Sequence, residues 1–307
     1  MKPDPMKLAH TPYDGSSKPF TIGLSQLDPD RWIEPDEHLA EQVEEKRRLL
    51  AEHGEQVFRA EPDTQAAQAE ILQALIDYLP ARHPAYYRRD GNRMQVAGRP
   101  IDLTDATMPA LQCAGFLVQD DLVLMRRGEN GWRIAAALLA FPSSWSLQEK
   151  FGKVMDEVHA PVPDFGAGSR NADLINRMFD NLAPGRIVVR WNWSVNWRAA
   201  LYHPAPTPAN ELASASSGDA VIRVERQTLR KLSVSGDILF TIRIYLDPVK
   251  TILAQPNAAE LAASLAAQLE ALTIDQARYK GLVSKRNELI RLLRAASQPA
   301  VLAESEA

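Results

Sequence analysis

The chain has 307 residues, of which 45% are hydrophobic and 24% are charged, as in an ordinary globular protein. Its 35 Lys and Arg residues are balanced by 39 Asp and Glu residues, so the formal net charge of −4 gives no general attraction to nucleic acid or to an anionic membrane. The N-terminus lacks the apolar segment of a secretory signal, and no stretch approaches the ~18 apolar residues of a membrane span, so we predict a cytoplasmic protein that binds neither membrane nor nucleic acid.

Two helices are predicted near the start of the chain, after residues 1–19, which we expect to form a flexible arm. Asp36 is the expected N-cap of an amphipathic helix that ends near Gly54. A second helix is predicted over about residues 64–79, because the apolar residues in this segment recur with a period of 3.6.

Period-two patterns in the middle of the chain predict a mostly antiparallel sheet of about five strands joined by short turns. The Asn130-Gly131 step between two apolar runs is a strong hairpin signal. The expected strands are 121–127, 132–141, 186–195, 220–228 and 237–247, and residues 197–203 are a candidate hairpin partner of 186–195. The predicted fold class is therefore α+β.

Two helices are predicted within this sheet region. A capping box at Ser146 begins the first, which carries Phe151 and Met155 on its inner face and is ended by Pro161. The second covers residues 171–182 and stops at a Pro-Gly step.

The C-terminal part of the chain returns to helix over residues 251–297, followed by a loose tail at 298–307. We therefore expect one domain over residues 20–250, which includes the N-terminal helices, with the C-terminal helices packed on it. No P-loop, G-x-S-x-G, H-E-x-x-H or C-x-x-C motif is present, so P-loop, hydrolase and zinc-site functions are disfavoured.

His159 is the first candidate ligand. It lies four residues after Met155 and eight after Phe151, so on a continuous helix it extends the inward row of side chains. A neutral imidazole at this place could ligate a metal or haem iron. The alternative is a core or C-cap histidine bonded to a backbone carbonyl.

Polar side chains on the predicted strands form the second candidate. Arg190 and Asn192 lie on one face of their strand, with Trp191 and Trp193 on the other. The segment RVERQTLR at 223–230 is dense in cations, which need anionic partners such as acidic side chains, haem propionates or nucleotide phosphates. For Arg190 and Asn192, the alternative is that they lie on the solvent-exposed face of a half-buried strand. For the segment 223–230, the alternative is a row of ion pairs on the protein surface.

Cys113 is the only cysteine, so this chain alone cannot hold an iron–sulfur cluster through about four thiolates. If the protein needs electrons, another protein must deliver them.

Five segments of the chain, in a fixed order, resemble one family. They are GLSQLD at 23–28, FPSSW at 141–145, HAPVP at 159–163, RWNW at 190–193, and RVERQTLR at 223–230 followed by FTIR at 240–243. These segments are similar to the alpha-subunit family of haem-dependent oxidative N-demethylases, which includes the haem subunit of dimethylamine monooxygenase. The resemblance covers about residues 20–250. Departures occur at Lys231-Leu232-Ser233, where Arg-Leu-Pro is expected, and at Ile244, where Thr is usual.

The resemblance implies a PAS-like antiparallel sheet that binds haem b and, with O₂, converts a small dimethylamine-like secondary amine to the primary amine and formaldehyde. It also implies that NADPH, FMN and an iron–sulfur cluster on partner reductase subunits supply the electrons. The residues it implicates are His159 as the metal ligand, Arg190, Asn192, Arg223, Arg226 and Arg243 as haem-binding residues, and Glu225, Tyr245 and Trp193 as catalytic or amine-binding candidates.

Glu225 is singled out because a dialkylamine is a small cation at neutral pH, and its pocket needs a carboxylate, an aromatic face or both. The alternative is that Glu225 is the salt-bridge partner of its neighbouring arginines. Two other functions stay open: a non-catalytic haem-binding PAS-type sensor, and a haem-free assembly protein that uses the arginine-rich strands as a docking face.

Overall fold

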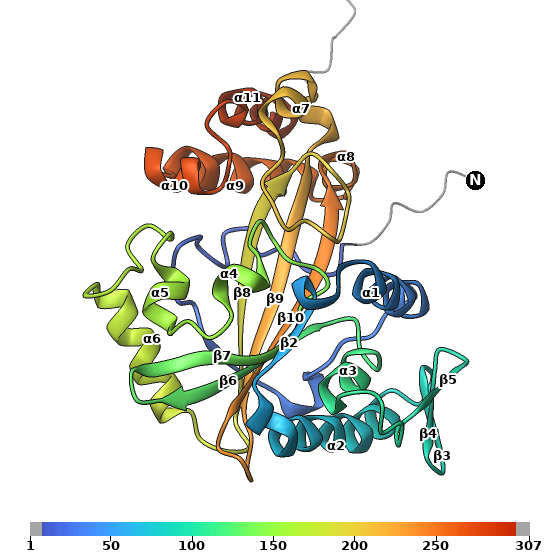
Figure 1. The fold of residues 1–307 in the computed structure, drawn as a ribbon. Coiled ribbons are helices and arrows are strands. Elements are labelled where there is room, and N and C mark those ends of the chain that lie inside the picture. The colour runs from blue at the N-terminus through green and yellow to red at the C-terminus, as the bar shows by residue number, and fades with distance from the viewer. Residues whose placement is uncertain (1–7, 299–307) are drawn as a thin grey trace, which may run out of the picture.

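A seven-stranded antiparallel sheet forms the centre of the computed structural model, which describes residues 8–298 (Figure 1). Its strands, in spatial order, are β1 (Ser25–Leu27), β8 (Ile187–Asn196), β9 (Val221–Lys231), β10 (Ile238–Pro248), β6 (Asp121–Gly128), β7 (Gly131–Leu138) and β2 (Phe58–Ala60). The predicted α+β class and the five long strands are confirmed. The sheet has seven strands instead of about five, because the two edge strands have three residues each and are too short to give a period-two signal.

Eleven α-helices surround this sheet in the described part of the chain. They are α1 (Leu39–His53), α2 (Gln65–Arg82), α3 (Ala110–Gly115), α4 (Leu147–Lys150), α5 (Met155–His159), α6 (Arg170–Asn181), α7 (Ala209–Ser214), α8 (Val249–Ile252), α9 (Ala258–Ala271), α10 (Ile274–Tyr279) and α11 (Arg286–Ser297). Short 3₁₀ turns cover Pro29–Arg31, Gly54–Gln56, Pro62–Thr64 and Ser217–Asp219. None of the helices between residues 8 and 298 has the length and apolar character required to cross a bilayer.

A second, three-stranded sheet is formed by β3 (Tyr87–Asp90), β4 (Arg93–Val96) and β5 (Arg99–Asp102). The sequence did not predict this sheet, because each of its strands has only four residues and contains at least one arginine. Its buried side chains join the core on the side of α2.

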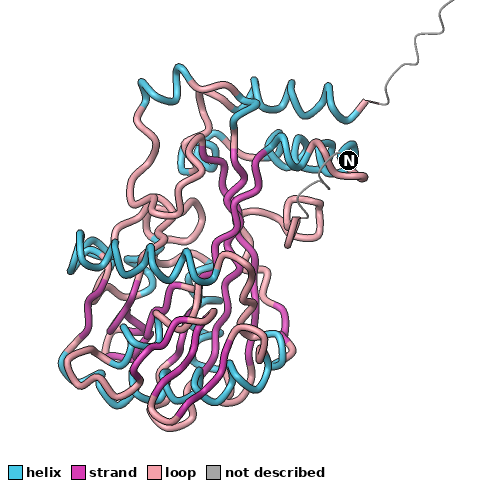
Figure 2. The backbone as a smooth tube through the Cα atoms, turned by 90° about the vertical axis from the view of Figure 1, so that its right-hand side faces the viewer, coloured by secondary structure: helices cyan, strands magenta, loops and turns pink. Residues whose placement is uncertain are grey.

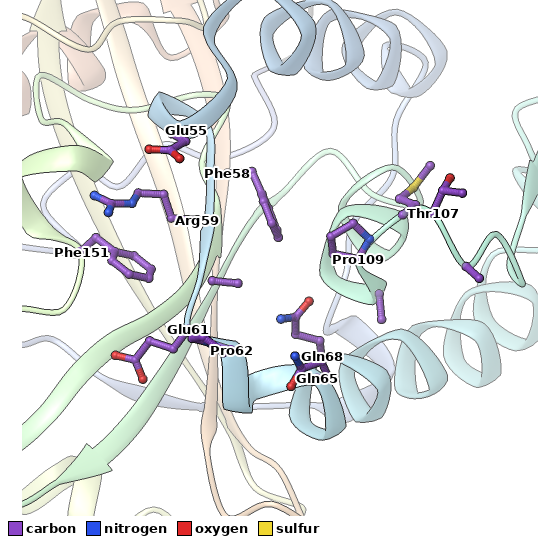
Figure 3. A pocket seen from close by; sticks show the side chains of 14 residues that line it. Glu55, Phe58, Arg59, Glu61, Pro62, Gln65, Gln68, Thr107, Pro109 and Phe151 are labelled. Carbon is purple, nitrogen blue, oxygen red and sulfur yellow. The ribbon is translucent and has the colours of Figure 1, made fainter.

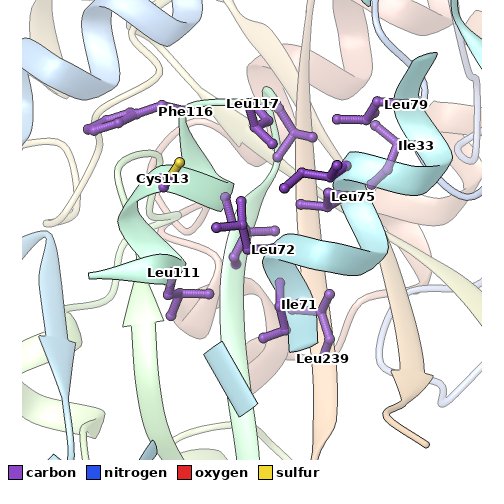
Figure 4. Packing of buried hydrophobic residues seen from close by; sticks show 14 of the residues in the cluster. Ile33, Ile71, Leu72, Leu75, Leu79, Leu111, Cys113, Phe116, Leu117 and Leu239 are labelled. Carbon is purple, nitrogen blue, oxygen red and sulfur yellow. The ribbon is translucent and has the colours of Figure 1, made fainter. Parts of the chain in front are cut away.

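Alternate residues of the central strands face two different cores. In β6, Leu122 and Leu124 belong to the cluster under α1, α2 and α3, whereas Val123 and Met125 belong to the cluster under α4, α5 and α6. Figure 4 shows the first cluster, where Ile71, Leu72 and Leu75 of α2 pack near Leu111 and Cys113 of α3. A third cluster joins the ends of β8–β10 to the C-terminal helices.

The three longest strands, β8, β9 and β10, extend beyond the rest of the sheet to the C-terminal helices (Figures 1 and 2). Buried residues of α9 and α11 pack there against Trp193 of β8 and Val224 of β9. The described part of the 251–297 segment is therefore joined to the sheet by a shared hydrophobic core.

Two predicted elements differ in the structure. The helix expected over residues 146–159 is two short helices, because Gly152 adopts φ +76° and interrupts the chain between α4 and α5. Residues 197–203 form no strand beside β8; β9 pairs with the whole of β8, and β1 pairs only with residues 187–189 on its other edge. His203 instead makes an isolated bridge with Ser143.

The described part of the expected N-terminal arm lies against the domain. Tyr13 is fully buried, and its hydroxyl donates to Asp247 over 3.0 Å. The His10 ring lies 4.3 Å from that of Trp191 and hydrogen-bonds Glu34 over 2.7 Å. Residues 1–7 of the arm and 299–307 of the expected tail lie outside the described residues.

Candidate functional site

A cavity of about 210 Å³ lies between one face of the central sheet and the segment that contains α4, α5 and α6. Most of its wall is apolar. The apolar residues come from β6, β7, β9 and β10 on the sheet side (Val123, Met125, Ile134, Leu229, Phe240 and Ile242) and from α5, α6 and the chain between them on the other (Met155, Val158, Val162, Phe165, Ile175, Met178 and Phe179). The N-terminal segment adds Phe20, Ile22 and Leu24.

Four polar side chains of β8 and β9 face this cavity. Arg190 pairs with Gln227 across the two strands, and Asn192 pairs with Glu225, so the four side chains occupy neighbouring positions on one sheet face. Gln227 Nε2 donates to Glu225 Oε2 over 2.6 Å and fixes the carboxylate. The strand alternation thus brings together three of the predicted residues: Arg190, Asn192 and Glu225.

His159 at the end of α5 also lines the cavity. Its Nδ1 lies 3.0 Å from the carbonyl oxygen of Met155, which can only accept, so Nδ1 carries the proton and Nε2 is left as the unprotonated nitrogen. Burial lowers the pKa of the imidazole to about 4, so the ring is neutral at pH 7. A neutral ring oriented by a backbone carbonyl is the usual state of a metal-binding histidine.

Three cations face the cavity: Lys150, Arg190 and Lys280. Burial lowers the pKa of each of them, that of Lys280 to about 8. Glu225 is the one carboxylate among the described lining residues, and none of these cations forms an ion pair with it within 4.0 Å. The cavity therefore has two more positive charges than negative ones.

The cations are only partly satisfied by the protein. Arg190 donates Nη2 to the carbonyl oxygen of Thr21 over 3.1 Å, but its buried Nε has no partner among the described residues. Lys150 lies 5.1 Å from the centre of the Trp145 ring. A buried donor without a partner costs about 1–3 kcal/mol, so an anion bound in the cavity would be stabilised by these groups.

Sequence reasoning did not identify Lys150, Gln227 or Lys280 as site residues. Gln227 could have been found, because it shares a strand face with Glu225. Lys280 could not, since nothing in the sequence indicates that the end of α10 lies beside β8.

Two residues predicted for the site, Arg223 and Trp193, lie near the cavity but make structural contacts instead of lining it. Arg223 is fully buried, and its guanidinium donates to Ser143 Oγ and to the carbonyl oxygens of residues 141, 142, 200 and 201. Trp193 is buried in the core under the C-terminal helices. Neither residue lines the cavity.

Three other predicted residues lie on the opposite face of the sheet. Arg226 donates to the carbonyl oxygens of residues 31 and 32, and Arg243 pairs with Asp36 over 2.5 Å. The hydroxyl of Tyr245 donates to Glu34 over 3.2 Å. Arg226 of β9 and Arg243 of β10 are directly opposite each other in the sheet, so their side chains lie on the same face. That face is the one away from the cavity.

A larger groove of about 710 Å³ lies beside β2, between that strand and the start of α3 (Figure 3). Phe58 and Pro109 line it. Its charged groups are largely engaged, because Arg59 lies over the Phe151 ring and Glu61 pairs with Arg133 over 2.7 Å. The cavity beside His159 combines an oriented imidazole with unpaired charges, and is therefore the better candidate.

One comparison with known proteins bears on this site. A model of the family described as haem-dependent oxidative N-demethylase, alpha subunit-like, matches residues 23–290. The match extends beyond the resemblance expected for residues 20–250 and includes both His159 and Lys280. Because it spans most of the 307 residues, the chain belongs to the haem-dependent oxidative N-demethylase alpha subunit-like family.

Proposed function

We propose that this protein is a haem-binding, oxygen-activating subunit that removes an N-methyl group from a small secondary amine, and that its cavity beside His159 is the haem site. The observation that carries the proposal is the His159 imidazole, which is neutral and has its Nδ1 proton directed at Met155, so that Nε2 is free to ligate iron. The central sheet would then be a PAS-like haem-binding sheet.

The charges of the cavity also fit haem b. The macrocycle is apolar, as is most of the cavity wall, and it carries two propionates. Lys150, Arg190 and Lys280 offer three positive charges against the single negative charge of Glu225. Two propionates therefore balance the site and give the unpaired Arg190 Nε an acceptor.

The free volume sets a condition on binding. About 210 Å³ is less than the ~300–1,000 Å³ of pockets that enclose a drug-sized ligand, so haem must displace part of the wall. We expect the segment 152–168 to be the part of the wall that moves. Its only α-helix is the five-residue α5, and Gly152 and Gly168 near its two ends both have positive φ.

Glu225 and Gln227 are suited to hold the amine. A secondary amine is a cation at neutral pH, and a carboxylate fixed by an amide hydrogen bond provides an oriented acceptor for its N–H groups. When haem is bound it supplies the chemistry of oxygen activation. The residues of this chain would position the methyl group and exclude water from the apolar side of the cavity.

Electrons would arrive from another subunit, as the name of an alpha subunit-like family implies. From the family resemblance we infer that NADPH, FMN and an iron–sulfur cluster reside on such partners. The single cysteine supports this for the cluster, because one thiolate cannot hold it here.

Turnover tests this function. Haem-loaded protein supplied with NADPH, O₂, a compatible reductase and dimethylamine should release formaldehyde, whereas protein without the reductase should not. The Glu225→Gln variant should retain haem and fold but need more amine for half-maximal rate. Formaldehyde release that is unchanged when the haem is removed would contradict the proposal.

A further inference from the structure

Lys280 reaches the cavity from the C-terminal helices, and its backbone belongs to a closed helix end. It caps the C-terminus of α10, after which Gly281 turns with φ +67°. The N–H of Leu282 donates to the carbonyl oxygen of Ala277 over 2.8 Å, which closes the helix end in the usual six-to-one pattern. Ala277 and Leu282 are both buried in the core that contains Trp193, so the position of the Lys280 backbone is fixed.

The ammonium group of Lys280 uses one of its three N–H donors within the described protein. Nζ donates to the carbonyl oxygen of Trp193 over 2.5 Å and lies 5.0 Å and 5.3 Å from the centres of the Phe20 and Trp193 rings. No described carboxylate lies within 4.0 Å of it, and Glu225 is held by Gln227 instead. Two of its donors therefore have no hydrogen-bond acceptor among the described residues, and the Lys280 side chain lines the cavity.

Two buried lysines elsewhere in the described chain have more hydrogen-bond partners than Lys280 has. The Nζ of Lys46 donates to three backbone carbonyls, those of residues 115, 118 and 120, at 2.5–3.2 Å. The Nζ of Lys285 donates to the carbonyl oxygen of Ala215 and pairs with Glu288 over 3.1 Å. Lys280 differs from both, because aromatic rings surround its ammonium group and its nearby carboxylate, Glu225, lies beyond ion-pair distance.

We propose that Lys280 binds a carboxylate inside the cavity, so that the C-terminal helices complete the ligand site instead of only packing on the domain. This inference rests on the proposed function. The carboxylate has two potential sources: a propionate of haem, or an acidic group on the amine substrate. The second source would make the substrate an N-methylated amino acid, whose ammonium would face Glu225 while its carboxylate faces Lys280.

Titration of the apoprotein with haemin, followed by the Soret absorbance, measures the first source. The variants are Lys280→Met, which keeps most of the side-chain length without the charge, and Lys280→Arg, which keeps the charge. Lys250→Met is the matched control, because Lys250 lies on an exposed position of α8. Urea denaturation of each apoprotein verifies that the variants are folded.

If the carboxylate belongs to haem, Lys280→Met should bind haemin about tenfold or more weakly, and Lys280→Arg and Lys250→Met should bind it nearly as the wild type does. If it belongs to the substrate, haemin affinity should be unchanged. In that case the spectral response of the loaded protein to N-methylglycine should be lost in Lys280→Met, and its response to dimethylamine should be retained.

Equal haemin binding together with equal or absent responses to N-methylglycine in wild type and Lys280→Met would overturn the role of Lys280 and leave the proposed function standing. Wild-type protein that binds no haemin would overturn both.

Discussion

Replacement of Arg223 by methionine should destabilise the protein without removing a cavity residue. The guanidinium holds two separate loops against β9: it donates to residues 141, 142 and 143 on one side and to residues 200 and 201 on the other. Burial lowers the pKa of Arg223 to about 10, so the group is still charged at pH 7. Methionine has a similar reach and cannot donate.

The size of the effect follows from two opposed contributions. Four carbonyl oxygens and one hydroxyl lose their donor, and each buried acceptor without a partner costs about 1–3 kcal/mol. Removal of the buried charge offsets several kcal/mol of this loss. We expect a net loss of about 3–4 kcal/mol, near the upper end for single substitutions. With an m-value of ~3 kcal/mol/M, the urea midpoint falls by about 1 M.

Urea unfolding followed by tryptophan fluorescence measures this loss. Arg198→Met is the control, because Arg198 is exposed and its ion pair with Glu211 should contribute about 0–1 kcal/mol. A stability loss below about 1 kcal/mol for Arg223→Met, accompanied by a large loss of haemin affinity, would refute the structural role and return Arg223 to the ligand site.

Three further predictions concern the cavity and the core. The pKa of His159 is lowered to about 4 in the fold against about 6.5 in the unfolded chain, so the unfolded state binds more protons between these values. The urea midpoint of the apoprotein should therefore fall as the pH drops from about 6.5 to about 4, and it should fall less in His159→Phe; equal pH profiles would contradict this. Gly115→Ala should cost about 1–3 kcal/mol in urea unfolding, because the new Cβ would lie 2.2 Å from Leu138 Cδ2; an unchanged midpoint would show that α3 shifts freely. Haemin should slow amide hydrogen exchange in residues 152–168 more than in α2, and equal slowing in both would argue against an outward movement of this segment.

The strand pattern predicted the polar wall of the cavity. Arg190 and Asn192 were placed on one face by alternation alone, and the structure puts both in the cavity. Arg226 and Glu225 are adjacent in β9, so alternation places their side chains on opposite faces of the sheet. The position of Arg243 depends on the pairing of β10 with β9, which the sequence does not reveal.

The covering segment shows what a local pattern cannot predict. His159 was expected in a row with Phe151 on one helix, but Gly152 breaks that helix, and Phe151 lines the groove beside β2. His159 faces the cavity because α5 packs on the sheet, and α5 is too short to be stable by itself. Lys280 depends on the same kind of tertiary contact, since it is 90 positions away from Arg190 in the chain.

Coordination of haem by His159 can be tested directly by titration of the apoprotein with haemin. Apoprotein should bind one equivalent of haemin per chain with a sharp Soret band, and His159→Ala should lose that band or shift it. Added imidazole should restore the wild-type spectrum by filling the space that the side chain left. A His159→Ala variant with the same haem content and the same spectrum as the wild type would contradict the assignment.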